Sequence, residues 1–182
     1  MAALLEGIPF HIVNLTDLAD IALPPEGELS YADNALGKAR AVARATGEMA
    51  LADDSGIEVD ELGGRPGVLS ARYGGDGLSD PERCQVMLNE MKGVPVERRR
   101  ARFRCLIAIV CPRRGLETTL EGVVEGVLLD APRGGGGFGY DPLFFYPPFG
   151  QSFAELSAEE KNRVSHRAQA CRQARAWVLS QP

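Results

Sequence analysis

Short apolar runs and amphipathic stretches alternate along the 182 residues of the chain. Runs of apolar, β-branched and aromatic residues predict strands, and here they cover residues 10–15, 49–52, 57–62, 102–111 and 116–129. The last two surround a Pro-Arg-Arg-Gly turn, so we expect them to form a meander packed against helices.

Helical patterns fill the segments between these runs. Ser30 and Gly47 are the residue types that begin and end a helix, which would cover residues 31–46. A loop with two consecutive prolines, residues 21–29, precedes it. The first long helix is therefore predicted with both of its ends.

The other helices are predicted from their first turns. Asp80 is the expected cap of a second helix with Pro81 in its first turn. Its buried stripe would consist of Cys84, Met87, Leu88 and Met91. Ser157 opens a capping box for a short helix, and Ser165 begins the terminal one. The pattern favours the α/β class, with a mixed, elongated β-sheet flanked by helices in a single domain over residues 1–182.

Composition narrows the class of protein. A net charge of -5 argues against a nucleic-acid partner, which would favour a basic surface. The four cysteines have no C-x-x-C spacing, so they are read as reduced, mostly buried thiols rather than a zinc site or redox pair. No apolar run approaches the ~20 residues of a membrane span, and the first residues lack the basic start of a signal peptide. We expect a soluble, cytoplasmic protein without a membrane partner.

The most informative segment is residues 51–75, where Asp53 and Asp54 are followed by Ser55 and Gly56. The chain is expected to turn at Ser55-Gly56, which would place the aspartates at the end of a strand. Side chains alternate along a strand, so only one of the two carboxylates can enter a given site. A carboxylate beside a hydroxyl suits a hard cation and its bound water. A hairpin with solvated acids explains the segment equally well.

A second candidate group opens the first long helix. Asn34 and Lys38 are four residues apart and share a face, while Asp33 points about a quarter turn away. The positive end of the helix dipole explains an aspartate at this position without any further function.

A third candidate is the run of four glycines at residues 134–137, followed by Phe138 and Asp141. Consecutive glycines cost backbone entropy, which makes sense where the backbone must approach a ligand. The ring of Phe138 offers a flat surface for a planar ligand. The alternative is a mobile loop that leads into an apolar strand.

A fourth group lies at residues 161–167. Lys161 precedes His166 and Arg167 near the start of the last helix, where free N–H groups and the dipole attract anions or ligand oxygens. The chain has only two histidines, so His166 at this position favours a site over a basic surface turn.

Together these segments resemble the inosine triphosphate pyrophosphatase family, whose members hydrolyse ITP, dITP and XTP to the monophosphate and pyrophosphate. The similar segments, in this order, are residues 30–39, 52–56, 63–73, 137–145 and 154–167. One motif of this kind is weak, whereas five in the right order and spacing are specific.

The resemblance implies a role for each matched residue. Asp54 corresponds to the general base and a Mg²⁺ ligand, and Ser55 to a substrate contact. Asp33 stands where the family usually has a glutamate metal ligand, and its shorter side chain would bind directly or through water. The implied substrate-binding residues are Lys38 and Lys161 for phosphate and substrate, Phe138, Gly139, Tyr140 and Asp141 around the base, and His166 and Arg167 at the purine edge.

This chemistry is coherent for an acidic protein. A triphosphate carries about four negative charges, so Mg²⁺ and local lysines are needed to bind it. A donor aimed at the 6-oxo group accepts hypoxanthine or xanthine and mismatches the 6-amino group of adenine. Guanine also has a 6-oxo group, so its exclusion must come from elsewhere. Members of the family are commonly homodimers, which the resemblance therefore implies here too.

The first residues depart from the family pattern. The family opens with an apolar strand and a Thr/Ser-x-Asn-x-x-Lys loop that cradles phosphates, whereas residues 1–7 resemble the helix after that loop. We therefore expect weaker phosphate binding, and a nucleotide-binding protein with weak or lost catalysis is the alternative function. A pyrophosphatase for modified pyrimidine or other nucleotides is a third.

Overall fold

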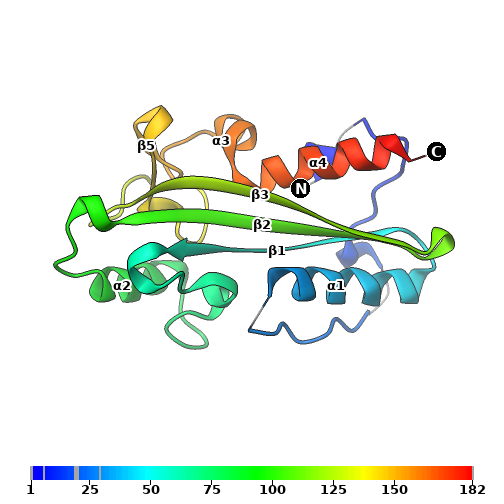
Figure 1. Cartoon of the computed structure of the whole chain (residues 1–182), viewed down its shortest axis with the longest axis horizontal. Coiled ribbons are helices and arrows are strands. Elements are labelled where there is room, and N and C mark those ends of the chain that lie inside the picture. The colour runs from blue at the N-terminus through cyan, green and yellow to red at the C-terminus, as the bar shows by residue number, and fades with distance from the viewer. Residues whose placement is uncertain (1, 6, 19–20, 29, 182) are drawn as a thin grey trace. The chain divides into compact units, whose positions relative to one another are not determined.

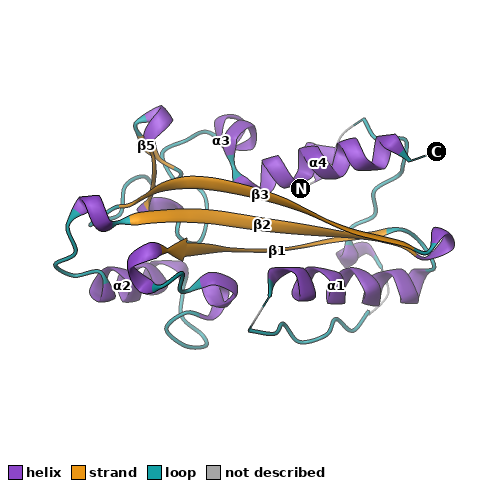
Figure 2. Ribbon diagram, viewed as in Figure 1, coloured by secondary structure: helices purple, strands orange, loops and turns teal. Residues whose placement is uncertain are grey.

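The computed structural model (Figure 1) describes residues 2–5, 7–18, 21–28 and 30–181. It confirms the α/β class, with a five-stranded sheet in the order β1-β2-β3-β4-β5 and flanking helices. The β3–β4 and β4–β5 pairs are antiparallel. Figure 2 shows the helices α1 (Tyr31–Thr46), α2 (Asp80–Glu90), α3 (Ala158–Val164) and α4 (His166–Ser180), and the strands β1 (Ala50–Val59), β2 (Arg100–Cys111), β3 (Leu116–Leu128), β4 (Phe144–Tyr146) and β5 (Gln151–Ser152).

The chain packs as two compact units, each of which is described by itself. The first unit contains Met1–Asp54, Cys105–Gly122 and His166–Pro182, and the second contains Ser55–Arg104 and Val123–Ser165. The organisation of residues 1–182 as a single domain stays a prediction.

In the first unit, β2 is buried on both of its faces. Its odd-numbered residues, Cys105 to Ile109, pack with α4, and the even-numbered Ala108 and Val110 pack with α1. This alternation is the two-residue period of a strand, and α1 and α4 accordingly lie on opposite sides of the strands (Figure 1). Small side chains line both helices where they meet the strand: Ala35, Ala39 and Ala43 in α1, and Ala170 and Ala174 in α4.

The core of the second unit is built around three phenylalanines. The ring centroids of Phe103 and Phe144 are 4.6 Å apart, and those of Phe144 and Phe153 are 4.8 Å apart. Met87 of α2 and Met91, the residue that follows its last turn, belong to the same buried cluster. The predicted stripe of α2 is confirmed, with Cys84, Met87 and Met91 buried and Leu88 packed against them.

The helix caps follow the sequence closely. The Ser30 side chain accepts the backbone N–H of Asp33 at 3.2 Å, and Gly47 ends α1 in the left-handed conformation. The capping box at Ser157 is confirmed. The predicted start of α2 was one residue late, because Ser79 is the cap and shares a capping box with Glu82.

The predicted strand at residues 10–15 is wrong. Residues 10–14 have no regular structure, and Leu15–Asp17 form a 3-10 turn. Phe10 is 53% exposed and Val13 is 49% exposed. Alternating apolar residues do not make a strand by themselves, because its backbone groups also need a partner. The predicted loop that follows is confirmed over residues 21–28, while Leu29 lies outside the described residues.

The predicted turn at Ser55-Gly56 is also wrong, because β1 continues through both residues to Val59. Asp54 therefore lies inside a strand and not at its end. Aspartate and glycine are poor strand formers in isolation, but pairing and packing override this local preference. The two strands predicted on either side of the turn are parts of one, and Asp60–Leu62 form a 3-10 turn after it.

Two further predictions concern the whole chain. All four cysteines are free thiols, and Cys84, Cys105 and Cys171 are buried, as expected. No helix in the described ranges is long and apolar enough to cross a membrane.

Candidate active site

The carboxylate of Asp54 is nearly buried in the first unit, where α1 holds it. The Asn34 side chain donates to Asp54 Oδ2 at 2.8 Å, and Lys38 Nζ lies 3.9 Å from Oδ1. The Asn34 amide is itself fixed, since it accepts from the Gly27 N–H at 2.7 Å and donates to the Gly27 carbonyl at 3.2 Å. Asn34 and Lys38 share a helix face, as expected, and that face meets Asp54.

Lys38 also brings a second carboxylate to this group. Its Nζ donates to Glu26 Oε1 at 2.6 Å, so carboxylates from β1 and from the loop before α1 both lie within 4 Å of one ammonium. No sequence pattern singled out Glu26, because it lies in an irregular loop. Asp33 is exposed, and Asn34 is the neighbouring residue that faces Asp54. Residues 33 and 34 point about 100° apart on a helix, so direct binding of a metal by Asp33 together with Asp54 stays a prediction.

The donor chemistry of this group fits Mg²⁺. Mg²⁺ prefers oxygen ligands and commonly takes one or two protein carboxylates, with phosphate oxygens and water completing its shell. Asp54 supplies such a carboxylate, and Glu26 is the second one near it. Within the described part of the chain, no group of three or more Asp, Glu, His or Cys side chains gathers to hold a metal by itself.

Asp53 forms an ion pair with a different residue, Arg167, in the first turn of α4. Arg167 Nε and one terminal nitrogen both donate to Asp53 Oδ2 at 3.0 Å. Burial acts to lower the pKa of the Arg167 guanidinium, but the charge and hydrogen bonds of Asp53 outweigh it and raise that pKa. Burial beside Asp53 also raises the pKa of the Cys105 thiol, which lies 3.9 Å from Asp53 Oδ2. The guanidinium is therefore held charged and oriented, whereas the thiol is kept neutral.

His166, the first residue of α4, is only 4% exposed. Its carbonyl lies so close to β3 that a Cβ added at Gly122 would stand 2.1 Å from it. A glycine on the strand thus allows the first turn of the helix, with His166 and Arg167, to approach the strand backbone.

In the second unit, Phe138 and its neighbours form another group. Phe138 is 57% exposed, and the Lys161 ammonium lies 4.4 Å from the centroid of its ring. Lys161 also pairs with Asp141, which is 1% exposed and accepts the Phe138 N–H on Oδ2 at 2.8 Å. The buried Asp141 carboxylate therefore holds the backbone of the loop, while the Phe138 side chain stays at the surface, where its ring can stack on a planar ligand.

The glycine run before Phe138 makes close approaches to the chain itself. A Cβ on Gly134 would stand 2.5 Å from the backbone of Ala154, and a Cβ on Gly137 would stand 2.1 Å from Asp141 Oδ2. At these two positions the absent side chain makes room for the protein's own atoms, and the expectation that the glycines admit a ligand stays a prediction. At Gly135 an added Cβ would meet nothing within 4 Å.

Tyr140 is buried with its hydroxyl donating to the Ser70 carbonyl at 2.9 Å. Ser70 in turn accepts the Ile57 N–H at 2.9 Å and donates to the Gly67 carbonyl at 2.6 Å. Burial raises the pKa of the Tyr140 phenol, so it remains a neutral donor. Its place in the predicted binding segment is therefore that of an anchor within the unit.

Comparison with known proteins decides the family. A profile described as the Ham1 family matches residues 1–177. The chain belongs to the Ham1 family. It is 49% identical over 170 residues to a dITP/XTP pyrophosphatase of Geobacter sulfurreducens, covering 93% of this chain and 85% of that one. It is 53% identical over 160 residues to a dITP/XTP pyrophosphatase of Thermus thermophilus, and the match covers 87% of this chain and 76% of that one. The solved structure of a HAM1 protein from Coxiella burnetii matches with a TM-score of 0.87 at 36% identity, covering 98% of this chain and 91% of that one.

In this Ham1 family member, each unit brings some of the predicted site residues together. Lys38 lies beside Asp54, and Asp141 and Lys161 lie with Phe138. Ser55 follows Asp54 in β1 and is partly buried. The family resemblance implied no site role for Asn34, Glu26, Asp53 or Asp80, each of which binds one of the predicted residues. Two sequence signals were available: the i to i+4 spacing to Lys38 pointed to Asn34, and adjacency to Asp54 pointed to Asp53.

Proposed function

We propose that this protein hydrolyses deaminated purine nucleoside triphosphates, namely dITP, XTP and ITP, to the monophosphate and pyrophosphate. Two relatives that match most of the chain carry the name dITP/XTP pyrophosphatase. The observation that carries the proposal is the Asp54 carboxylate, nearly buried, oriented by Asn34 and close to Lys38.

Asp54 is the proposed general base. A carboxylate held in one orientation can align a water molecule and accept its proton as it attacks the α-phosphorus, which expels pyrophosphate. Lys38 is the proposed phosphate contact, since its ammonium already pairs with the carboxylate oxygens of Glu26 and Asp54. When bound, Mg²⁺ would neutralise phosphate charge, and Asp54 with Glu26 or Asp33 would hold it.

The group around Phe138 is proposed to recognise the base. The ring would stack on the purine with its exposed part, and Lys161 lies at the ring within cation–π distance. Gly139, Tyr140 and Asp141 would shape the loop that carries the ring. His166 and Arg167 are the proposed donors toward the 6-oxo group, and Asp53 keeps the Arg167 guanidinium in place.

The first experiment measures pyrophosphate release from ITP, dITP, XTP, ATP and GTP with Mg²⁺ and with EDTA. The proposal expects turnover of ITP, dITP and XTP with Mg²⁺, loss of turnover with EDTA, and little release from ATP. Equilibrium binding of ITP is measured in parallel. Binding of ITP without turnover would instead support the alternative function of a nucleotide-binding protein. The absence of both binding and turnover would overturn the assignment.

Assembly and location are part of the same proposal. We propose a homodimer that acts in the cytoplasm, as the family resemblance implies. Light scattering coupled to size-exclusion chromatography tests the dimer at micromolar concentrations, because a dimer has twice the 19.6 kDa mass of the chain. A mass equal to one chain over that range would contradict it.

A further inference from the structure

The Phe138 loop has an anchor on α2, which lies between the five short motifs on which the family resemblance of the sequence rests. Asp80, the first residue of α2, accepts the Gly139 N–H on Oδ2 at 2.6 Å. Cys84, one turn further along the helix, lies with its Sγ 3.4 Å from the Gly139 carbonyl. A hydrogen bond to a charged acceptor is stronger than one between neutral groups. Both polar groups of Gly139 are therefore bound to one helix.

This contact acts on Phe138 because of where it falls in the backbone. The Phe138 N–H, on one side of the Phe138 Cα, is bound by Asp141 at 2.8 Å. The Gly139 N–H, on the other side, is bound by Asp80. Two carboxylates thus fix the peptide groups that flank the Phe138 Cα, and these set the direction of its side chain. Phe138 as a residue is more than half exposed and lies outside the buried core, so core packing does not hold it.

Capping of α2 does not account for the Asp80 carboxylate contact. The Ser79 side chain and the Glu82 carboxylate form the capping box at this end of the helix. Asp80 Oδ2 instead reaches residue 139, 59 positions away in the chain. Its charge in the first turn adds only ordinary dipole stabilisation.

We infer that Asp80 is a positioning residue for nucleobase binding, acting through the Gly139 amide on the orientation of Phe138. The inference rests on the proposed function, in which Phe138 stacks on the base. Loss of the contact should weaken binding of the base and leave the chemistry at the phosphates unchanged. Asp80→Ala should raise KM for ITP about 3- to 10-fold with kcat within about 2-fold, a part of what one base–aromatic stack contributes.

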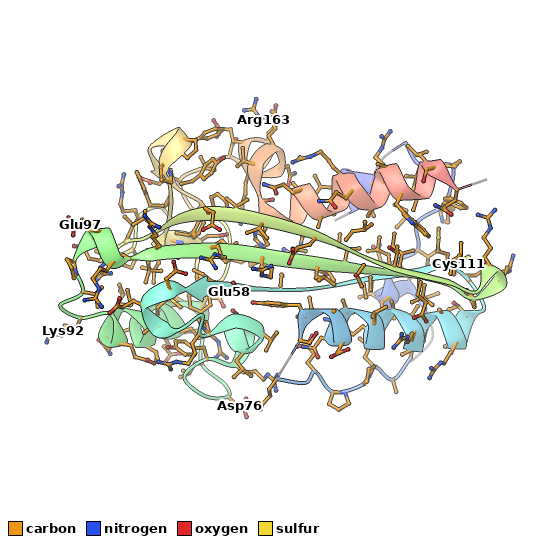
Figure 3. The ribbon with its side chains drawn as sticks, viewed as in Figure 1. Glu58, Asp76, Lys92, Glu97, Cys111 and Arg163 are labelled. Atoms are coloured by element: carbon orange, nitrogen blue, oxygen red, sulfur yellow. The ribbon has the colours of Figure 1, made fainter. Side chains whose placement is uncertain are left out.

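The test is a double-mutant cycle with Asp80→Ala, Phe138→Ala and the double variant, assayed for KM and kcat with ITP. If Asp80 acts through the ring, Asp80→Ala should change KM by less than about 2-fold once Phe138 is absent. Asp80→Asn should restore most of the affinity, because its amide oxygen can still accept the Gly139 N–H. Asp76→Ala is the matched control, an exposed aspartate in the loop before α2 (labelled in Figure 3). Equal KM effects in both backgrounds would overturn the inference.

A second measurement does not depend on activity. Hydrogen–deuterium exchange of residues 134–141 should accelerate in Asp80→Ala and stay unchanged in Asp76→Ala, in protein without nucleotide. Unchanged exchange in Asp80→Ala would overturn the anchoring role even if the enzyme hydrolyses ITP. A wild-type protein without ITP turnover would instead count against the proposed function, and the exchange result would still decide whether Asp80 holds the loop.

Discussion

Asp53 and Asp54 are consecutive in β1, and their carboxylates are bound from opposite sides of the strand. Arg167 of α4 binds Asp53, and Asn34 of α1 binds Asp54. The alternation of side chains along a strand produces this division. Because α1 and α4 pack on opposite faces of β2 as well, each aspartate belongs to the helix on its own side.

Asp54→Asn should abolish turnover while largely preserving the fold. The change removes a base and a charge at nearly constant volume, and loss of a general base lowers kcat by about 10²- to 10⁴-fold. Pyrophosphate release from ITP measures it. Asp60→Asn is the control, since Asp60 follows the same strand but is exposed and pairs with Arg102. Full activity of Asp54→Asn would exclude Asp54 as the base.

Asp53→Asn should have a different kinetic effect. It removes the charge that holds the Arg167 guanidinium and keeps an acceptor oxygen, so KM for ITP should rise while kcat changes less. Loss of a charge-assisted hydrogen bond should also lower the free energy of unfolding by about 1–3 kcal/mol. Steady-state kinetics and urea unfolding test the two effects. A fall in kcat as deep as that of Asp54→Asn would contradict the division of roles.

Phe138→Ala should raise KM for ITP more than it lowers kcat, because the ring only stacks. Truncation of one stacking ring costs about 1–3 kcal/mol of binding. Phe149→Ala is the control, since Phe149 is also exposed and contacts Tyr146 instead. An unchanged KM in Phe138→Ala would contradict the stacking role.

Gly122→Ala should destabilise the first unit and disturb the start of α4. The added Cβ would lie 2.1 Å from the His166 carbonyl and 2.6 Å from the Ala170 nitrogen, so the helix must shift. Overpacking of this kind costs about 1–3 kcal/mol of unfolding free energy.

Gly37→Ala, in the interior of α1, should have the opposite effect. Its added Cβ would meet only Pro24, at 3.4 Å. Alanine in a helix interior is more stable than glycine by about 0.5–1 kcal/mol, so the free energy of unfolding should rise. Urea unfolding of both variants tests the pair, and a stable, fully active Gly122→Ala would contradict the close approach.

Stability above pH 10 should depend on Tyr73. Burial, followed by its hydrogen bond to Glu90, raises the pKa of the Tyr73 phenol to about 12. Tyrosine in an unfolded chain has a pKa of about 10. The contribution is therefore fully present below pH 10 and is lost as the pH rises from 10 to 12. Wild type should lose stability in this window faster than Tyr73→Phe, by up to about 1.4 kcal/mol per pH unit. Urea unfolding of both proteins at pH 9, 10 and 11 measures this difference. An equal loss of unfolding free energy in wild type and Tyr73→Phe between pH 10 and pH 11 would contradict the prediction.

The local signals of the sequence predicted α1, β2, β3 and the helix starts well. Ser30, Gly47 and Ser157 act through contacts within a few residues, so their roles can be read from the sequence. The failures occurred where distant partners decide the structure. The run at residues 10–15 lacks a strand conformation despite its pattern, and Asp53 to Gly56 form a strand despite theirs.

The candidate site shows the same limit. The spacing of Asn34 and Lys38 and the pair of aspartates pointed to a face of α1 and a strand that contact one another in the structure. The contacts of Glu26 with Lys38, and of Asp80 with Gly139, join positions 12 and 59 residues apart. Neither contact leaves a periodic pattern or motif, because Glu26 and Gly139 lie in irregular backbone.

The unequal demands on the four consecutive glycines have a practical consequence. Gly134 and Gly137 have no room for a side chain, but Gly135 faces open space and lies outside the left-handed backbone region. A cysteine introduced there would carry a fluorescent label three residues from Phe138. The four native thiols are an obstacle only at partly exposed Cys111, since the other three are buried. A Cys111→Ser background would therefore give a protein in which arrival of a nucleotide at the loop is followed optically, separately from its hydrolysis.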